Sequence, residues 1–172
     1  GHEVAVEFDI SDAVTIEAVA LFRPALVVAP FLKRAIPEAV WRHTVCLVVH
    51  PGIVGDRGPS ALDWAIVDGE REWGVTVLQA EAKLDAGPVW AAETFAPRDA
   101  TKSRLYGNEV TVGGARSVLA AAKRWAAVAE AVHPGLSRQS DWPALSSVLQ
   151  SLADNDLDVA QATRAAADRR PL

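Results

Sequence analysis

The residues best suited to chemistry lie between His50 and Gly87. His50 directly follows the apolar run Val45–Val49, and a turn rich in glycine and proline, residues 51–60, comes next. In open α/β sheets, ligands bind outside the carboxyl ends of strands, so a histidine at this point is well placed for catalysis. Its imidazole can donate or accept a proton near neutral pH. A histidine that merely closes a turn is the alternative interpretation.

A second turn, residues 83–88, contains Asp85 and follows the apolar run Gly74–Gln79. If that run is a strand of the same sheet, Asp85 would face His50 across one crevice. A carboxylate beside an imidazole orients the ring and stabilises its charged form. An aspartate that closes an Asx-turn is the alternative, and spacing alone leaves both interpretations open.

Other common site patterns are missing from the sequence. The glycines at 52, 55 and 58 match neither the dinucleotide-binding G-x-G-x-x-G pattern nor the P-loop. No group of cysteines and histidines has metal-ligand spacing, so we predict no metal site. The single Cys46 lies within the apolar run before His50, and we expect a buried, inert thiol.

Composition restricts the class of protein and its partners. The chain has 172 residues, which suits one domain, and 50% of them are hydrophobic. It carries 22 acidic against 17 basic residues, a net charge of -5, so it has no overall attraction to nucleic acid. No apolar stretch approaches the roughly 20 residues that span a bilayer, and no signal peptide is recognisable. We therefore predict a cytoplasmic protein without nucleic-acid or membrane partners.

Apolar runs alternate with helical patterns along the first part of the chain. We expect strands at Glu3–Phe8, Ala25–Pro30, Val45–Val49 and Gly74–Gln79. We expect helices at Asp12–Arg23, Ile36–His43, Ser60–Asp68 and from Thr101 towards Val132, with two more near Pro143–Ala153 and Leu157–Arg169. This alternation predicts an α/β fold with a mostly parallel sheet flanked by helices. We predict one domain at 1–125 and a helical tail of unclear origin at 126–172.

Several long segments resemble a single family. They are His50–Ile53, Gly55–Ile66, Trp73–Ala80 with the later Asp85–Gly87, and Ala29–Pro37. These segments are similar to HypX/HoxX-type maturation factors of nickel–iron hydrogenases, and the likeness extends from Gly1 to about Trp125. The wider 10-formyltetrahydrofolate-dependent formyltransferases share an Asn-x-His pattern at a strand end, then an Arg-Gly pair, then Asp-x-Gly. His50, Arg57-Gly58 and Asp85-Ala86-Gly87 match these elements.

The resemblance implies a Rossmann-like formyltransferase fold that the chain enters at the second strand, so that the first strand is missing. It implies 10-formyltetrahydrofolate as formyl donor, with His50 and Asp85 as catalytic residues. The implied donor-binding residues are Pro30, Phe31, Leu32, Lys33, Arg57 and Gly58. The loop after residue 29 would bind the pterin through backbone groups, and Arg57 would hold its own loop or an anionic group. A surface ion pair is the alternative for Arg57.

The family also implies an acceptor and a pathway. HypX-type proteins are associated with the carbon monoxide ligand of the nickel–iron site, through formyl transfer to coenzyme A and a hydratase-like second domain. One position departs from the formyltransferase pattern, because Val48 stands where the family has asparagine. Two alternatives remain: a formyltransferase with a methionyl-tRNA or amino-sugar acceptor, and a degenerate, non-catalytic binding or assembly module.

Overall fold

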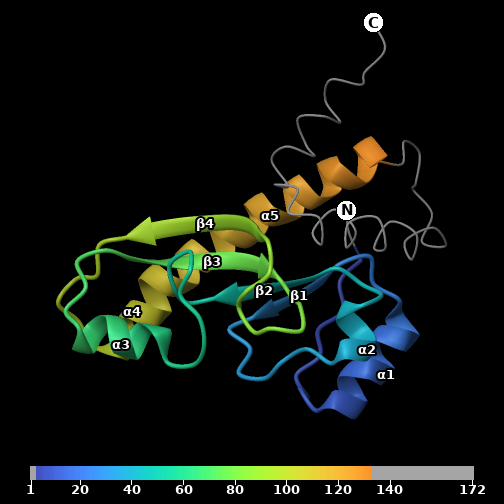
Figure 1. Ribbon diagram of the computed structural model, residues 1–172, viewed down its shortest axis with the longest axis horizontal. Coiled ribbons are helices and arrows are strands. Elements are labelled where there is room, and N and C mark those ends of the chain that lie inside the picture. Colours follow the sequence, from blue (N-terminus) through green and yellow to red (C-terminus); the bar gives the residue numbers. More distant parts are fainter. Residues whose placement is uncertain (1–2, 133–172) are drawn as a thin grey trace, which may run out of the picture.

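A computed structural model describes residues 3–132 (Figure 1). Its elements, in chain order, are α1 (Asp12–Phe22), β1 (Val27–Pro30), α2 (Glu38–Trp41), β2 (Cys46–His50), α3 (Ala61–Val67), β3 (Trp73–Gln79), β4 (Val89–Phe95), α4 (Lys102–Leu105), the π-helix η1 (Tyr106–Val110) and α5 (Thr111–Val132). The helices expected before residue 133 are therefore confirmed, as are three of the four expected strands. The two further helices predicted near Pro143–Ala153 and Leu157–Arg169 lie outside the described residues.

The prediction of a mostly parallel sheet is wrong. The four strands lie in the order β1-β2-β3-β4, and only β1 and β2 run parallel. Both β2 with β3 and β3 with β4 are antiparallel. The short helix α3 lies at the carboxyl end of β2 and does not cross back over the sheet (Figure 1), so β3 begins at the end where β2 stops. Strand β4 was not predicted, although its partly alternating burial is typical of a strand with one covered face.

The expected strand Glu3–Phe8 is also wrong. This segment is exposed and irregular, and its side-chain carboxylates bind nearby backbone amides. Glu7 Oε1 accepts hydrogen bonds from the amides of Phe8 and Asp9, each at 2.8 Å, and Asp9 Oδ1 accepts one from Ser11 at 2.8 Å. Such local bonds compete with pairing in a sheet. Alternating apolar residues alone therefore did not make a strand here.

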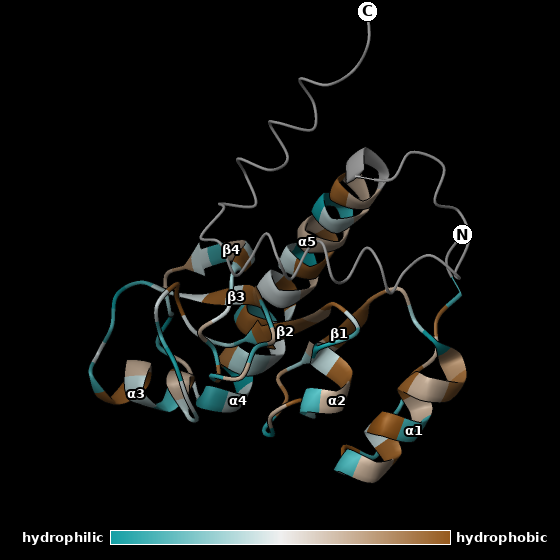
Figure 2. Ribbon diagram, turned by 45° about the vertical axis from the view of Figure 1, so that its right-hand side comes forward, coloured by the Kyte–Doolittle hydropathy of each residue, from teal (hydrophilic) through white to brown (hydrophobic). Residues whose placement is uncertain are grey.

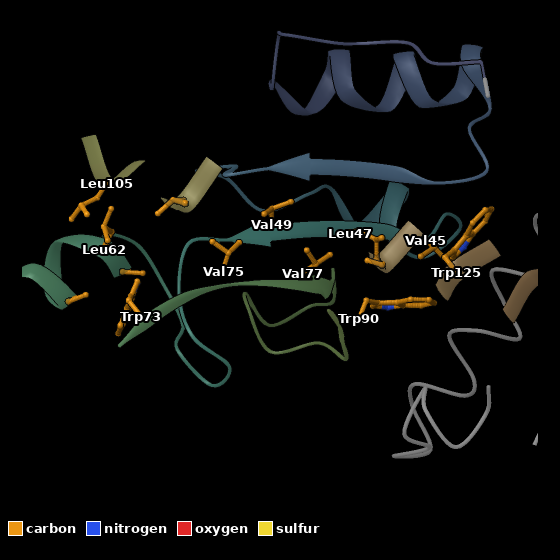
Figure 3. Packing of buried hydrophobic residues seen from close by; sticks show 14 of the residues in the cluster. Val45, Leu47, Val49, Leu62, Trp73, Val75, Val77, Trp90, Leu105 and Trp125 are labelled. Carbon is orange, nitrogen blue, oxygen red and sulfur yellow. The ribbon is translucent and has the colours of Figure 1, made fainter. Parts of the chain in front are cut away.

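The two faces of the sheet bury different sets of residues. In β2, Leu47 and Val49 point into a large core that α5 closes, whereas Cys46 and Val48 point to a smaller cluster against α1 and α2. Figure 3 shows part of the large core, with Trp90 and Trp125 at one end and Trp73 at the other. Figure 2 shows β2 and β3 as hydrophobic, and every residue of β3 is buried.

The long helical segment from Lys102 to Val132 contains a π-helical turn, η1. Directly after this turn, Thr111 Oγ1 donates a hydrogen bond to the Tyr106 carbonyl at 2.6 Å. The extra residue in that turn rotates the following helix, so Val112 and Leu119 are exposed although their spacing predicts an apolar stripe. Gly113 and Gly114 face the sheet instead. A Cβ added to Gly114 would lie 3.0 Å from the Phe31 ring, so Gly114 lets α5 approach closely. Within residues 3–132, no helix is long and apolar enough to cross a membrane.

Candidate active site

His50 lies where the carboxyl ends of two parallel strands meet. It is the last residue of β2, and the preceding Val49 pairs with Pro30, the last residue of β1. The side chain of His50 projects to the α1/α2 face, since strand side chains alternate between faces. Only 4% of the residue is exposed, so its ring must find its polar partners within the protein.

Two carboxylates face the two nitrogens of the His50 ring. Nε2 lies 2.7 Å from Asp56 Oδ2, and Nδ1 lies 3.5 Å from Asp85 Oδ2. The same oxygen of Asp85 accepts a hydrogen bond from the Gly58 amide at 3.0 Å. The Asp85 side chain is 13% exposed and that of Asp56 25% exposed. The ring is therefore oriented from both sides, with Asp85 as the more enclosed partner.

Asp85 reaches His50 by a different route from the one the sequence suggested. Because β3 is antiparallel to β2, its carboxyl end lies beside Leu47, at the far end of β2 from His50. Residues 80–88 leave β3 there, run back towards His50 and return, and the Gln79 amide binds the Pro88 carbonyl at 2.9 Å. At the return point, a Cβ on Gly87 would lie 2.0 Å from the Gln79 carbonyl oxygen. The expected proximity of Asp85 and His50 is confirmed, but the loop produces it and not a parallel strand.

Sequence reasoning missed Asp56. It lies on the loop after His50, between Gly55 and Gly58, whose φ angles of 95° and 92° favour glycine. The stem of this loop is held to β3, because Thr76 Oγ1 donates to the Gly52 carbonyl at 2.8 Å. The available signal was the aspartate six residues after the histidine in a glycine-rich turn, since such a turn can fold back on the strand end.

The predicted donor-binding loop after β1 lies next to His50 in the sheet, but its side chains diverge. Phe31 packs on the large-core side, 5.4 Å from the Tyr106 ring in an edge-on contact, and burial raises the pKa of Tyr106. Leu32 packs against the α1/α2 cluster, whereas Pro30 and Lys33 are exposed. The Phe31 amide already donates to the Val49 carbonyl at 3.0 Å, so a pterin would have to use other backbone groups of the loop.

The remaining predicted positions differ in how close they come to His50. Gly58 contributes its amide to Asp85, whereas the Arg57 side chain is exposed and forms no ion pair among the described residues. Val48 pairs with Ala29 and Leu78, and its side chain packs in the α1/α2 cluster. An apolar side chain therefore occupies the position at which the resemblance implies an asparagine. In residues 3–132, no group of histidines, cysteines and carboxylates is arranged to hold a metal ion.

A buried imidazole between two carboxylates, at the end of a strand in an α/β fold, is an arrangement suited to proton transfer and to acyl transfer. The chain belongs to the formyl transferase family, which residues 8–110 match. Within this family, its resemblance to HypX/HoxX factors is confirmed. It is 61% identical over 121 residues to the hydrogenase maturation factor HoxX of Bradyrhizobium diazoefficiens, a match that covers 70% of this chain and 21% of HoxX.

Solved structures also support the assignment of this chain to the formyl transferase family. HypX from Aquifex aeolicus, in complex with tetrahydrofolic acid, is 53% identical, with a TM-score of 0.70 over 72% of this chain and 22% of HypX. Phosphoribosylglycinamide formyltransferase from Campylobacter jejuni, at 16% identity and a TM-score of 0.55, shares the fold; the match covers 65% of this chain and 60% of that enzyme. Methionyl-tRNA formyltransferase of Halalkalibacterium halodurans is 29% identical over 109 residues, which cover 62% of this chain and 34% of that protein. The chain thus spans about a fifth of the length of its HypX and HoxX relatives.

Proposed function

We propose that this domain transfers a formyl group from 10-formyltetrahydrofolate to coenzyme A, in the cytoplasm, as a step towards the carbon monoxide ligand of a nickel–iron hydrogenase. The observation that carries the proposal is the buried His50 with a carboxylate at each ring nitrogen. The identity of 53% to a HypX that was solved with tetrahydrofolic acid supports a folate as donor. A hydratase-like second domain in the complete protein would then act on the formyl product.

His50 is the proposed donor to the formyl oxygen. When a nucleophile attacks the formyl carbon, negative charge develops on that oxygen, and a positioned N–H stabilises it most in the transition state. Asp85 holds the ring from the Nδ1 side and is itself held by the Gly58 amide. The strand end therefore supplies a donor whose direction is set before substrate binds.

The donor-binding role of the loop after β1 rests on its place beside His50. Pro30 pairs with Val49, so Phe31, Leu32 and Lys33 begin where the reacting histidine lies. The pterin would bind backbone groups of this loop other than the Phe31 amide. Arg57 is exposed on the opposite loop and is available to an anionic group of a substrate.

One observation favours a second function. Val48 carries no amide and is packed against apolar neighbours, so the site lacks a donor that other formyltransferases have at this position. Loss of that donor would suit a domain that binds folate without transferring the formyl group. A methionyl-tRNA acceptor is less favoured, because a net charge of -5 offers no general attraction to RNA phosphates.

The test combines calorimetry with a product assay. The complete protein is titrated with 10-formyltetrahydrofolate and then incubated with coenzyme A, and formyl-coenzyme A is measured by mass spectrometry. We expect donor binding and formation of the thioester. Binding without transfer to coenzyme A, methionyl-tRNA or an amino sugar would support the binding-module alternative. Absence of donor binding would contradict both functions.

A further inference from the structure

Asp56 lies next to His50 but has no part in the formyl transfer proposed above. Its Oδ2 lies 2.7 Å from His50 Nε2, closer than Asp85 lies to Nδ1. Among the described residues, His50 is the only side chain with which the Asp56 carboxylate forms a hydrogen bond or ion pair. Asp56 is also the more exposed of the two carboxylates, at 25% against 13%. It therefore stands on the side of the ring from which a substrate can approach.

The surrounding loop is built to accommodate this contact. A Cβ added to Gly52 would lie 2.3 Å from Asp56 Oδ2 and 2.5 Å from His50 Nε2, so a larger residue there would push the two side chains out of their present positions. The Gly52 backbone is in turn fixed to β3 through Thr76, and the Trp73 indole N–H binds the Pro51 carbonyl at 2.9 Å. A firm stem thus carries Asp56, which itself has the freedom of a partly exposed side chain.

We propose that Asp56 is the carboxylate that takes the proton of the acceptor thiol, and that it then passes this proton to His50 Nε2. This inference rests on the proposed formyl transfer. In the ligand-free protein, Asp56 pairs with Nε2. The formyl oxygen replaces it there, and the freed carboxylate turns to the incoming thiol. Asp85 stays behind the ring throughout.

The proposed sequence is balanced in atoms and protons. Asp56 accepts the thiol proton as the sulfur–carbon bond forms, and the electron pair of the carbonyl bond moves to the oxygen that Nε2–H stabilises. The pair on that oxygen then re-forms the carbonyl bond as the bond between the formyl carbon and the folate nitrogen breaks, and that nitrogen takes the proton of Nε2. Protonated Asp56 finally gives its proton to Nε2 across the 2.7 Å contact. One proton has passed from the thiol to the folate, and both side chains have returned to their starting states.

The test measures formyl transfer by the complete protein against pH for the wild type and Asp56→Asn. General bases contribute about 10²–10⁴-fold, so we expect the variant to be about 10²-fold slower at pH 7. It can use only acceptor that is already ionised, so its rate should rise about tenfold per pH unit until the pH reaches the pKa of the acceptor thiol. Acetate should partly restore Asp56→Ala. Donor affinity by calorimetry should change less than twofold, which also shows that the variants are folded.

Two controls separate this role from a structural one. Asp63→Asn alters an exposed carboxylate that pairs with Lys102 at 2.6 Å, and its rate should equal that of the wild type. Asp85→Asn should be slow at every pH, since it orients His50 and takes no proton from the acceptor. If Asp56→Asn is as fast as the wild type, or slow without recovery at high pH and without acetate rescue, the role of Asp56 is wrong while formyl transfer stands. If the wild type transfers no formyl group, the proposed function fails and this inference fails with it.

Discussion

On the α5 face of the sheet, large side chains such as Trp90, Trp125 and Leu105 are buried together, whereas the opposite face buries a small cluster of mostly short residues. That cluster includes Ala29, Cys46 and Ala80, and it leads directly to His50 at the end of β2. The α5 face therefore supplies most of the stability, and the opposite face carries the candidate site. Substitutions on the first face should change the free energy of unfolding, and substitutions on the second should change the reaction rate.

The largest effect is expected from the α5 face. Trp90→Ala should lower the free energy of unfolding by about 3–5 kcal/mol, because it leaves a cavity in the core and removes the hydrogen bond that the indole N–H donates to Gln79 Oε1 at 3.3 Å. Leu119→Ala is the matched control, since Leu119 is 63% exposed, and should change stability by less than about 0.5 kcal/mol. Denaturant unfolding measures both. Equal losses in the two variants would contradict the division between the faces.

On the opposite face, His50→Ala should lower the rate of formyl transfer about 10²–10³-fold and leave donor affinity nearly unchanged. Asp85→Asn should slow the reaction comparably, because the ring loses its enclosed partner. The double variant should be little worse than either single one, since residues that act as a unit are not additive. Steady-state kinetics with calorimetry of donor binding tests this. A full rate for His50→Ala would show that the catalytic assignment is wrong.

Gly52→Ala should disturb the site more than the fold. Its Cβ would overlap the ends of the Asp56 and His50 side chains, which can move, so the rate should fall about tenfold or more while unfolding changes by about 1 kcal/mol. Gly107→Ala has open space around its Cβ and serves as control, with an unchanged rate. The two rates and the two denaturation midpoints form the measurement. Loss of stability without loss of rate in Gly52→Ala would contradict the close packing of the histidine and the aspartate.

The smallest effect concerns Cys46 and pH. Burial raises the pKa of this thiol to about 12 from a reference of 9.0. A raised pKa in the folded state stabilises the fold fully below pH 9, and this contribution is lost between pH 9 and about 12, because only the unfolded chain ionises there. By pH 10 the wild type should lose about 1 kcal/mol relative to Cys46→Ala. Denaturant unfolding at pH 7 and pH 10 measures the difference. Rapid reaction of the native thiol with a disulfide reagent at pH 8 would contradict its burial.

The sequence by itself indicated most of the local elements and the proximity of His50 to Asp85. Continuous apolar runs predicted β2 and β3, because strands that are covered on both faces bury nearly every residue. The histidine at the end of β2 and the aspartate at 85 could be chosen as a pair from their places beside apolar runs and glycine-rich turns. The failure at Glu3–Phe8 shows the limit of such patterns, since alternation does not reveal whether a neighbouring strand is there to pair with.

Only the tertiary structure decided the direction of the strands and the second carboxylate of the site. Strand direction depends on where α3 lies relative to the sheet, which is a matter of packing between segments far apart in the chain. Asp56 meets His50 because Gly52 lets the loop pass within contact distance and the glycines at 55 and 58 let it turn back. The residue types were visible in the sequence, but the distance between them depends on backbone angles and on hydrogen bonds to β3, which become defined only when the chain is folded.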